Sequence, residues 1–292
     1  MILEDLFQDM AELRQMVPGL ESNLTFGDLN ASAITARKRI TDLIGQELYG
    51  MIIAGQSTDA DIFDAMRIAI ANFIARQHLV FDTIARRKDD IDVYKYELEE
   101  MERAYMDNYY NAMDTLMRLL CEQGSEQWEA SRLRRMTVSL PLPEAALFDE
   151  FYPIDMSYLF FFRTVPMQRE VYEQHLSGLF DKLSLKEPGT GGCDALRGRL
   201  LRVTAKWTVA LALRRFDIIE FPAVIRNLFS DSKASRSGTT VQQRLLQMAD
   251  SLVLECESET ETLQMLMDSE QSDNISPRTS FNREDDLIIL MP

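Results

Sequence analysis

Apolar residues recur every three or four positions through most of this chain, which is the spacing of one face of an α-helix. Between residues 59 and 86, Ile62, Met66, Ile70 and Phe73 share one stripe, and further apolar residues widen it. A band this broad predicts a helix that is buried on more than one side. The predicted helices cover residues 1–15, 32–53, 59–86, 92–121, 126–136, 144–151, 157–183 with an interruption near Pro166, 194–216, 218–229 and 241–267. The pattern therefore predicts a mainly α fold.

A short apolar pattern occurs twice, about 130 residues apart, and indicates a duplicated helical unit. The segment Leu48–Ile52 closes one predicted helix, and Leu179–Leu183 closes another. In the helix that follows each of them, Ala71–Phe73 matches Ala205–Trp207. The expected counterparts are 32–53 with 157–183, 59–86 with 194–216, and 92–121 with 241–267. We therefore expect two tandem repeated helical-bundle domains.

Two prolines mark the best boundary between the copies, because Pro141 and Pro143 favour an extended and fairly stiff connector. An apolar segment such as Leu287–Met291 is seldom left exposed to water. We expect it to add a strand to a sheet or enter a groove, in its own subunit or in the next. We predict a first helical domain at residues 1–139, a Pro-containing linker at 140–156, a second helical domain at 157–268 and an extended C-terminal tail at 269–292.

The bulk composition limits the class of protein. The 292 residues are 46% hydrophobic, which is enough for one large or two medium cores. The net charge of −16 disfavours general binding of nucleic acid, because attraction to phosphate needs clustered basic residues. An acidic surface would still suit a conduit through which DNA slides without adhering.

The cysteines and the apolar runs indicate the cellular compartment in which the protein is expected. Cys121, Cys193 and Cys256 are odd in number and widely spaced, which argues against a disulfide framework or a zinc site and for a reducing cytoplasm. The first residues show no basic segment followed by an apolar core, so we expect no secretory signal. Apolar runs also fall far short of the ~20 residues of a membrane helix, and we expect no membrane contact.

Little in the sequence equips the chain for catalysis. No cysteine or carboxylate spacing completes a metal or acid–base site around His78 and His175. Gly189–Gly192 is followed by no Lys-Ser or Lys-Thr, so we expect a flexible connector and not a phosphate loop. Adjacent carboxylates such as Glu99 and Glu100 do not face each other on a helix, as a glycosidase pair would. We expect no enzyme activity, no metal and no cofactor.

Charge is distributed unevenly along the second half. Residues 250–273 carry eight acidic side chains and no basic one, whereas residues 197–236 carry nine basic side chains. Two arrangements fit: an acidic helix face packs beside a basic one within the domain, or the two meet between copies, head to tail, and close a ring. The candidate residues for a contact between subunits are Arg214, Arg215, Arg226, Glu255, Glu257, Glu259, Leu287, Ile288, Ile289 and Leu290.

Three segments carry a resemblance to a known family, namely Ala11–Leu20, Leu43–Tyr49 and Phe148–Ile154. In this order and spacing they resemble a family of uncharacterised proteins from phages and prophages of gut Bacteroidales, including crAss-like phages. The resemblance extends to about Met267 and so covers nearly the whole chain. Each half of that family is similar to the small helical head–tail adaptor, or connector, proteins of tailed phages. The resemblance therefore implies a fused double adaptor.

The role that this resemblance implies is structural. Adaptors of this kind form rings beneath the portal, commonly of about twelve subunits, and continue the DNA channel toward the tail. The expected partners are further copies of the chain, the portal protein and tail or neck proteins, with DNA passing through without sequence-specific binding. We expect the protein in the virion neck after synthesis in the host cytoplasm, and the family offers no catalytic residues. A cytoplasmic helical protein-interaction scaffold without a viral role is the alternative.

Overall fold

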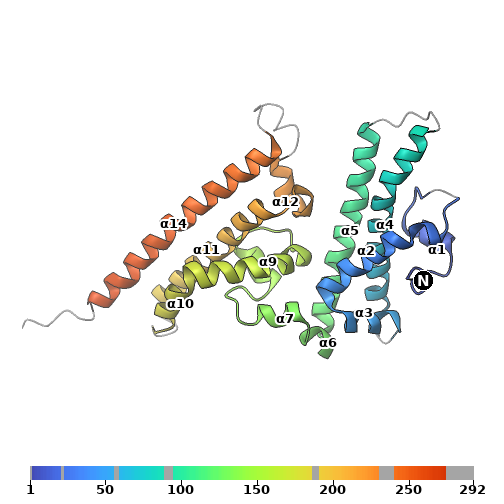
Figure 1. Ribbon diagram of the computed structural model, residues 1–292. Coiled ribbons are helices and arrows are strands. Elements are labelled where there is room, and N and C mark those ends of the chain that lie inside the picture. Colours follow the sequence, from blue (N-terminus) through green and yellow to red (C-terminus); the bar gives the residue numbers. More distant parts are fainter. Residues whose placement is uncertain are drawn as a thin grey trace, which may run out of the picture.

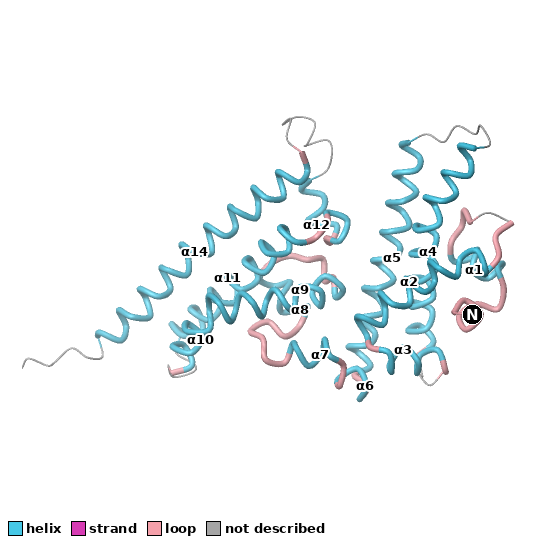
Figure 2. Tube along the Cα trace, in the orientation of Figure 1, coloured by secondary structure: helices cyan, strands magenta, loops and turns pink. Residues whose placement is uncertain are grey.

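The computed structural model describes residues 2–20, 23–55, 59–88, 95–185, 191–229 and 240–273. The helices are α1 (Met10–Met16), α2 (Phe26–Ile44), α3 (Gln46–Ile53), α4 (Ala60–Lys88), α5 (Lys95–Gln123), α6 (Glu126–Glu129), α7 (Arg132–Thr137), α8 (Ala145–Phe151), α9 (Tyr158–Val171), α10 (Ser177–Ser184), α11 (Gly191–Arg215), α12 (Ala223–Arg226) and α14 (Val241–Asp273), with a π-helical turn η1 (Tyr172–Leu176) and two 3₁₀ turns, η2 (Ile218–Glu220) and η3 (Asn227–Phe229). These described ranges are mainly helical and contain no strand, which confirms the predicted fold class at that level (Figure 2).

Four long helices form the two main pairs, α4 with α5 and α11 with α14 (Figure 1). Their apolar stripes predicted all four, and the observed bounds lie close to the predicted ones. The stripe of Ile62, Met66, Ile70 and Phe73 on α4 is at most 3% exposed. Burial of such a face supplies most of the stability of a helix in a protein. In addition, α2 packs on α4, and α9 packs on α11.

The helix predicted over residues 32–53 is in fact two helices, because Gly45 separates α2 from α3. Gly45 has a φ of 89°, a left-handed conformation that glycine adopts without the steric cost that other residues bear. The start of α2 also differs from the prediction and lies earlier, at Phe26. The Asp28 carboxylate accepts hydrogen bonds from the N–H (2.9 Å) and the hydroxyl (2.7 Å) of Thr25, and this capping box defines the start.

The interruption predicted near Pro166 lies further along the chain. The helix α9 continues through Pro166 to Val171, and the regular hydrogen bonding changes in η1, where the N–H of Ser177 bonds to the carbonyl of Tyr172. A proline inside a helix costs about 3 kcal/mol, because its ring clashes and one hydrogen bond is lost. Side chains on most sides of α9 are buried, and this packing offsets the cost.

The N-terminal helix is shorter than predicted, although its apolar residues are buried. The helix α1 begins at Met10, after Asp9, whose carboxylate accepts a hydrogen bond from the N–H of Glu12 (2.8 Å). An aspartate in an extended conformation is a preferred helix cap, so the helix starts there and not at the first residues. Leu6 and Phe7 precede the cap and still pack in the core, at 3% and 2% exposed.

The segment predicted to be an extended linker is packed into the core. Leu140 and Leu142 are buried, and Gln168 of α9 binds both main-chain polar groups of Leu142. The Gln168 Oε1 accepts from the Leu142 N–H (3.0 Å), and its Nε2 donates to the Leu142 carbonyl (3.1 Å). These buried hydrogen bonds hold the segment against α9, so it is not a free spacer. The helix predicted at residues 144–151 is present as α8.

Buried side chains form two clusters. The larger extends from Leu3 to Leu252 and crosses the predicted boundary, with α5 packed on α9. The smaller joins η1, α10, α11 and α14 and includes Trp207. The helix α14 continues to Asp273, so it passes the predicted start of the tail, and residues 274–292 lie outside the described ranges. The proposed domain boundaries stay a prediction.

Candidate functional site: charged faces, junction and groove

The acidic and basic segments of the second half meet within the chain. The helix α14 lies beside α11, and basic side chains of α10 and α11 pair with its carboxylates. The pairs among the described residues are Lys206 with Glu255 (2.8 Å), Arg199 with Glu259 (2.6 Å), Arg214 with Asp250 (2.7 Å) and Lys182 with Asp268 (2.6 Å). This is the first of the two arrangements that the charge pattern allows. The side chains are 33–64% exposed, so each pair contributes about 0–1 kcal/mol.

The remaining charged candidates for a subunit contact are also placed by the structure. Arg215 forms two hydrogen bonds of 2.7 Å with the carboxylate of Glu170, and these lower the pKa of Glu170. Arg226 binds Asp107 of α5 at 2.6 Å and so joins the two halves. Glu257 is exposed and forms no ion pair within the described residues. The apolar candidates outside the described ranges are Leu287, Ile288, Ile289 and Leu290. Contact between copies stays a prediction.

Asp114 of α5 caps the first turn of α9. Its carboxylate accepts hydrogen bonds from the Leu159 N–H (2.7 Å) and from the Ser157 hydroxyl (3.0 Å). The Ser157 oxygen in turn accepts from the Phe160 N–H (3.2 Å). A helix N-terminus favours a negative charge, but burial dominates here and raises the pKa of Asp114 to about 6. A titratable carboxyl therefore lies where the two halves meet.

The turn that leads into α9 has a strained backbone. Asp155 and Met156 have φ values of 54° and 53°, a left-handed conformation that costs non-glycine residues about 1–2 kcal/mol each. The Asp149 carboxylate accepts hydrogen bonds from the N–H groups of Ile154 (2.8 Å) and Met156 (3.1 Å). On another side, the Val224 N–H donates to Asp155 (2.8 Å). These bonds hold the turn and fix the direction of α9 relative to α8 and α12.

A second polar cluster joins α2, α5, α9 and η2. Arg163 pairs with Glu220 at 3.0 Å, and Arg39 approaches the same carboxylate at 3.6 Å. The hydroxyl of Tyr110 is buried and has no hydrogen-bond partner within the described residues, and burial raises its pKa. Tyr110 lines two cavities of about 180 and 130 Å³. Both have room for ordered water, which would satisfy this hydroxyl.

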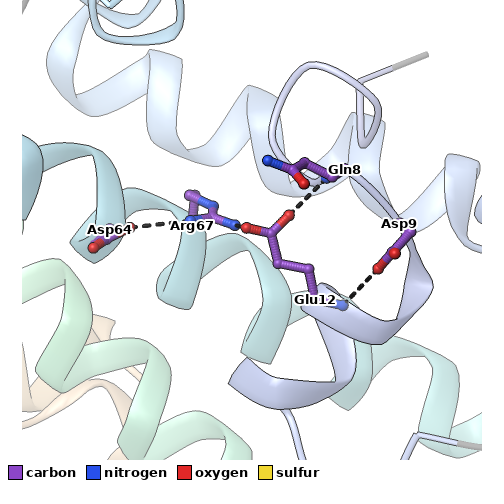
Figure 3. Close-up of polar contacts among 5 residues, drawn as sticks. All are labelled: Gln8, Asp9, Glu12, Asp64 and Arg67. Atoms are coloured by element: carbon purple, nitrogen blue, oxygen red, sulfur yellow. Dashed lines mark hydrogen bonds and ion pairs between the residues drawn. The ribbon is translucent and has the colours of Figure 1, made fainter.

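The N-terminal segment is fastened to α4 through Arg67, which is 8% exposed (Figure 3). The guanidinium binds the carboxylate of Glu12 and pairs with Asp64 at 3.1 Å. It also lies over the rings of Phe7 and Phe63, at 5.0 and 5.3 Å from their centres. Aromatic faces attract a cation, so this buried charge is compensated on several sides. The contacts hold α1 against α4.

A groove of about 700 Å³ runs along the seam between α4 and α5. The end of α1 contributes Gln15 and Met16 to its lining. The buried alanines Ala65 and Ala112 contribute little volume there, and Ile68 is 37% exposed. A second hollow of about 420 Å³ shares the residue Leu119 with the groove. Small side chains on the paired helices α4 and α5 thus leave an open groove between them.

Amide side chains line this groove. Asn72 is 1% exposed, accepts a hydrogen bond from Asn108 (3.2 Å) and donates one to the Ile68 carbonyl (2.9 Å). The side-chain amides of Asn111 and Gln15 have no hydrogen bond within the described residues, and both residues are exposed. The sequence analysis did not predict the groove. Small and amide residues recur in helical register on α4 and on α5, but this pattern does not show that the two helix faces lie opposite each other.

The two histidines considered for catalysis lie on different helical elements. His175 is exposed on η1, and its ring stacks on Trp207 with centroids 4.1 Å apart, whereas His78 is half-buried on α4. The three cysteines are free, and no cluster of metal-ligating side chains gathers within the described residues. Gly191 opens α11, and residues 186–190 lie outside the described ranges. His175 therefore covers one face of Trp207.

Comparison of the chain with protein-family models, curated proteins and solved structures finds no match. Within the described ranges, no helix combines the length and the apolar content that crossing a membrane requires. The features that bear on function are therefore its own: two pairs of long helices, a polar junction between them and a groove along one pair.

Proposed function

We propose that this chain is a structural virion protein, a head–tail adaptor subunit whose ring joins the portal to the tail and continues the DNA channel. The observation that carries the proposal is the common order and pairing of elements in the two halves. In each half a broken helix packs on a long helix, and a second long helix pairs with the first. In the proposed duplication, α2–α3, α4 and α5 would be the counterparts of α9–α10, α11 and α14, in this order. A duplicated adaptor unit predicts such a correspondence.

Burial at matched positions supports the correspondence. Leu48 in α3 and Leu179 in α10 are each 5% exposed. Phe73 in α4 and Trp207 in α11 are 3% and 5% exposed. The helix break differs, because Gly45 separates α2 from α3 whereas a π-helical turn follows α9. The burial of these residues supports a duplicated unit, and the two breaks differ in local detail.

The junction and the surface charge suit a subunit of a ring wall. The Asp114 cap and the Arg226–Asp107 pair tie the second half to α5, so both halves would enter a ring as one unit. Glu257 and Glu261 on α14 are exposed and form no ion pair within the described residues. An acidic face of this kind, turned toward a channel, would repel phosphate and let DNA pass. A ring with a basic lumen would contradict this orientation.

Native mass spectrometry of the full chain, alone and with the portal protein encoded near it, tests the proposal. The expected result is a closed ring of about twelve copies, formed alone or on the portal. Portal, capsid and terminase genes are expected beside its gene, and cryo-EM of the particle neck should place the chain there. A chain that stays monomeric with portal present would overturn the proposal and favour a helical interaction scaffold without a viral role.

A further inference from the structure

The groove between α4 and α5 has the lining of a peptide site, and we infer that it binds the apolar segment Leu287–Met291 of a second copy. This rests on the proposed function, because it specifies how neighbouring copies in the ring hold one another. Three basic residues of α11, namely Arg199, Lys206 and Arg214, already pair with carboxylates of α14 within the chain. The contact that we infer between copies uses apolar and amide side chains and leaves these pairs in place.

The amide lining favours an extended peptide as the ligand. An extended segment carries N–H and carbonyl groups that must find partners when water is excluded. The side chains of Asn111 and Gln15 offer donors and acceptors that no described residue uses, and Asn108 keeps an acceptor. A docked helix would satisfy its own backbone and leave these amides unpaired.

The groove also matches the segment in length and in apolar surface. From Asp61 to Asn72 the helix α4 rises about 16 Å, and five extended residues span about 16 Å. Ile68 and Leu119 offer apolar surface along this length, and Ala65 leaves room for an inserted side chain. Leu287–Met291 consists of five large apolar residues, which would leave water on docking.

The course of α14 makes a second copy the source of the segment. This helix is about 50 Å long, starts near α12 and leads away from α4 and α5 (Figures 1 and 2). Residues 274–286 reach at most about 45 Å when fully extended. To reach the groove of the same chain, this connection would have to run back along the whole length of α14, which is longer than the connection itself. A neighbouring copy placed beyond the end of α14 presents its groove within reach.

Fluorescence anisotropy with a labelled synthetic peptide of residues 284–292 and the full chain tests the site. We expect saturable binding, and Ile68→Asp should raise Kd by about tenfold or more, because the new charge must lose water on docking. Asn111→Trp fills the groove from an exposed position and should weaken binding similarly. Ile34→Asp is the matched control, since Ile34 is 50% exposed on α2 and does not line the groove.

The outcomes of this titration decide the site. Binding that is absent, or that has the same Kd in the unaltered chain and in both groove variants, overturns the inference. Far-UV circular dichroism of each variant verifies that it is folded. The peptide with Ile288→Asp and Ile289→Asp should not bind, and equal binding by this peptide would also overturn the assignment, because the apolar side chains would then not be recognised.

Photo-crosslinking identifies which copy supplies the segment. A benzoylphenylalanine in place of Arg118, an exposed residue of the groove lining, in chains with one affinity tag, is mixed with unaltered chains that carry a second tag. Crosslinked species that contain both tags and map to residues 287–291 are expected, and crosslinks confined to single chains would overturn the choice of a second copy. A ring that persists with Ile288→Asp and Ile289→Asp combined overturns the inference and leaves the adaptor proposal standing. An unaltered chain that forms no ring with portal present overturns the adaptor proposal itself.

Discussion

Asp114 on α5 and Leu159 on α9 are joined by a 2.7 Å hydrogen bond from the Leu159 N–H to the carboxylate, so a side chain of the first half caps a helix of the second. Burial raises the pKa of this carboxyl from 3.8 to about 6. Between these two values the folded chain keeps a proton that the unfolded chain has lost. The junction between the halves is therefore coupled to pH.

Stability should fall as this carboxyl ionises. The contribution of the neutral form is fully present below pH ~4 and is lost as pH rises through about 6, by up to about 3 kcal/mol. Asp114→Asn keeps a neutral cap and should remove this dependence. Urea unfolding at several pH values between about 4 and 7 measures it, with Asp181→Asn at an exposed site as the control. Equal pH slopes for the unaltered chain and Asp114→Asn would contradict the prediction.

The buried pair of hydrogen bonds between Gln168 and Leu142 should contribute strongly to stability. Gln168→Ala leaves the Leu142 N–H and carbonyl without partners in the core and opens a cavity, so we expect a loss of about 2–4 kcal/mol. Gln174→Ala at an exposed position is the matched control and should change stability by less than about 0.5 kcal/mol. Chemical denaturation measures both. Similar losses in the two variants would show that the segment is not held by Gln168.

Two glycines should respond in opposite directions to substitution by alanine. Gly45→Ala places a side chain at a φ of 89° and should destabilise the chain by about 1 kcal/mol or more. Gly50→Ala lies inside α3 with open space around the new Cβ, and should stabilise the chain by about 0.5–1 kcal/mol. Thermal unfolding of both variants gives the comparison. A stabilising Gly45→Ala would contradict the observed break between α2 and α3.

Charge reversal on α14 separates pairing within the chain from contact between copies. Glu255→Lys and Glu259→Lys place like charges beside Lys206 and Arg199, and each should cost about 1 kcal/mol of stability without changing the oligomeric state. Glu257→Lys, at an exposed position without an ion pair in the described ranges, is the control. Sedimentation velocity at low and high salt measures assembly. Oligomers lost only in the first two variants would instead indicate head-to-tail charge contacts.

The helical breaks show where local patterns are insufficient. Proline is the residue that disrupts a helix most strongly. The helix α9 nevertheless continues through Pro166, because buried side chains surround that part of the helix. Gly45 lies within a favourable helical pattern and separates two helices through its left-handed conformation. Local propensity is worth at most a few kcal/mol, and packing of the surrounding core overrides it at Pro166. At Gly45 the break instead follows from the left-handed conformation that glycine allows.

The charge pattern was readable in sequence, but the partner of each charge was not. The sequence shows that residues 250–273 are acidic and that residues 197–236 are basic. It cannot show that Lys206 faces Glu255 within one chain, because the same complementarity is possible between two copies. Only the packing of α11 beside α14 brings these atoms together.

The apolar stripes along the chain are sufficient to predict the four long helices, because a helical stripe is a local property of neighbouring residues. The groove, in contrast, forms only when the helices pack together. Its amides at Gln15, Asn72 and Asn111 come from three helices, and no spacing along the chain predicts that they share one seam. The packing of whole helix faces determines which distant residues lie close together. Small side chains such as Ala65 leave a groove only when a second helix lies opposite them.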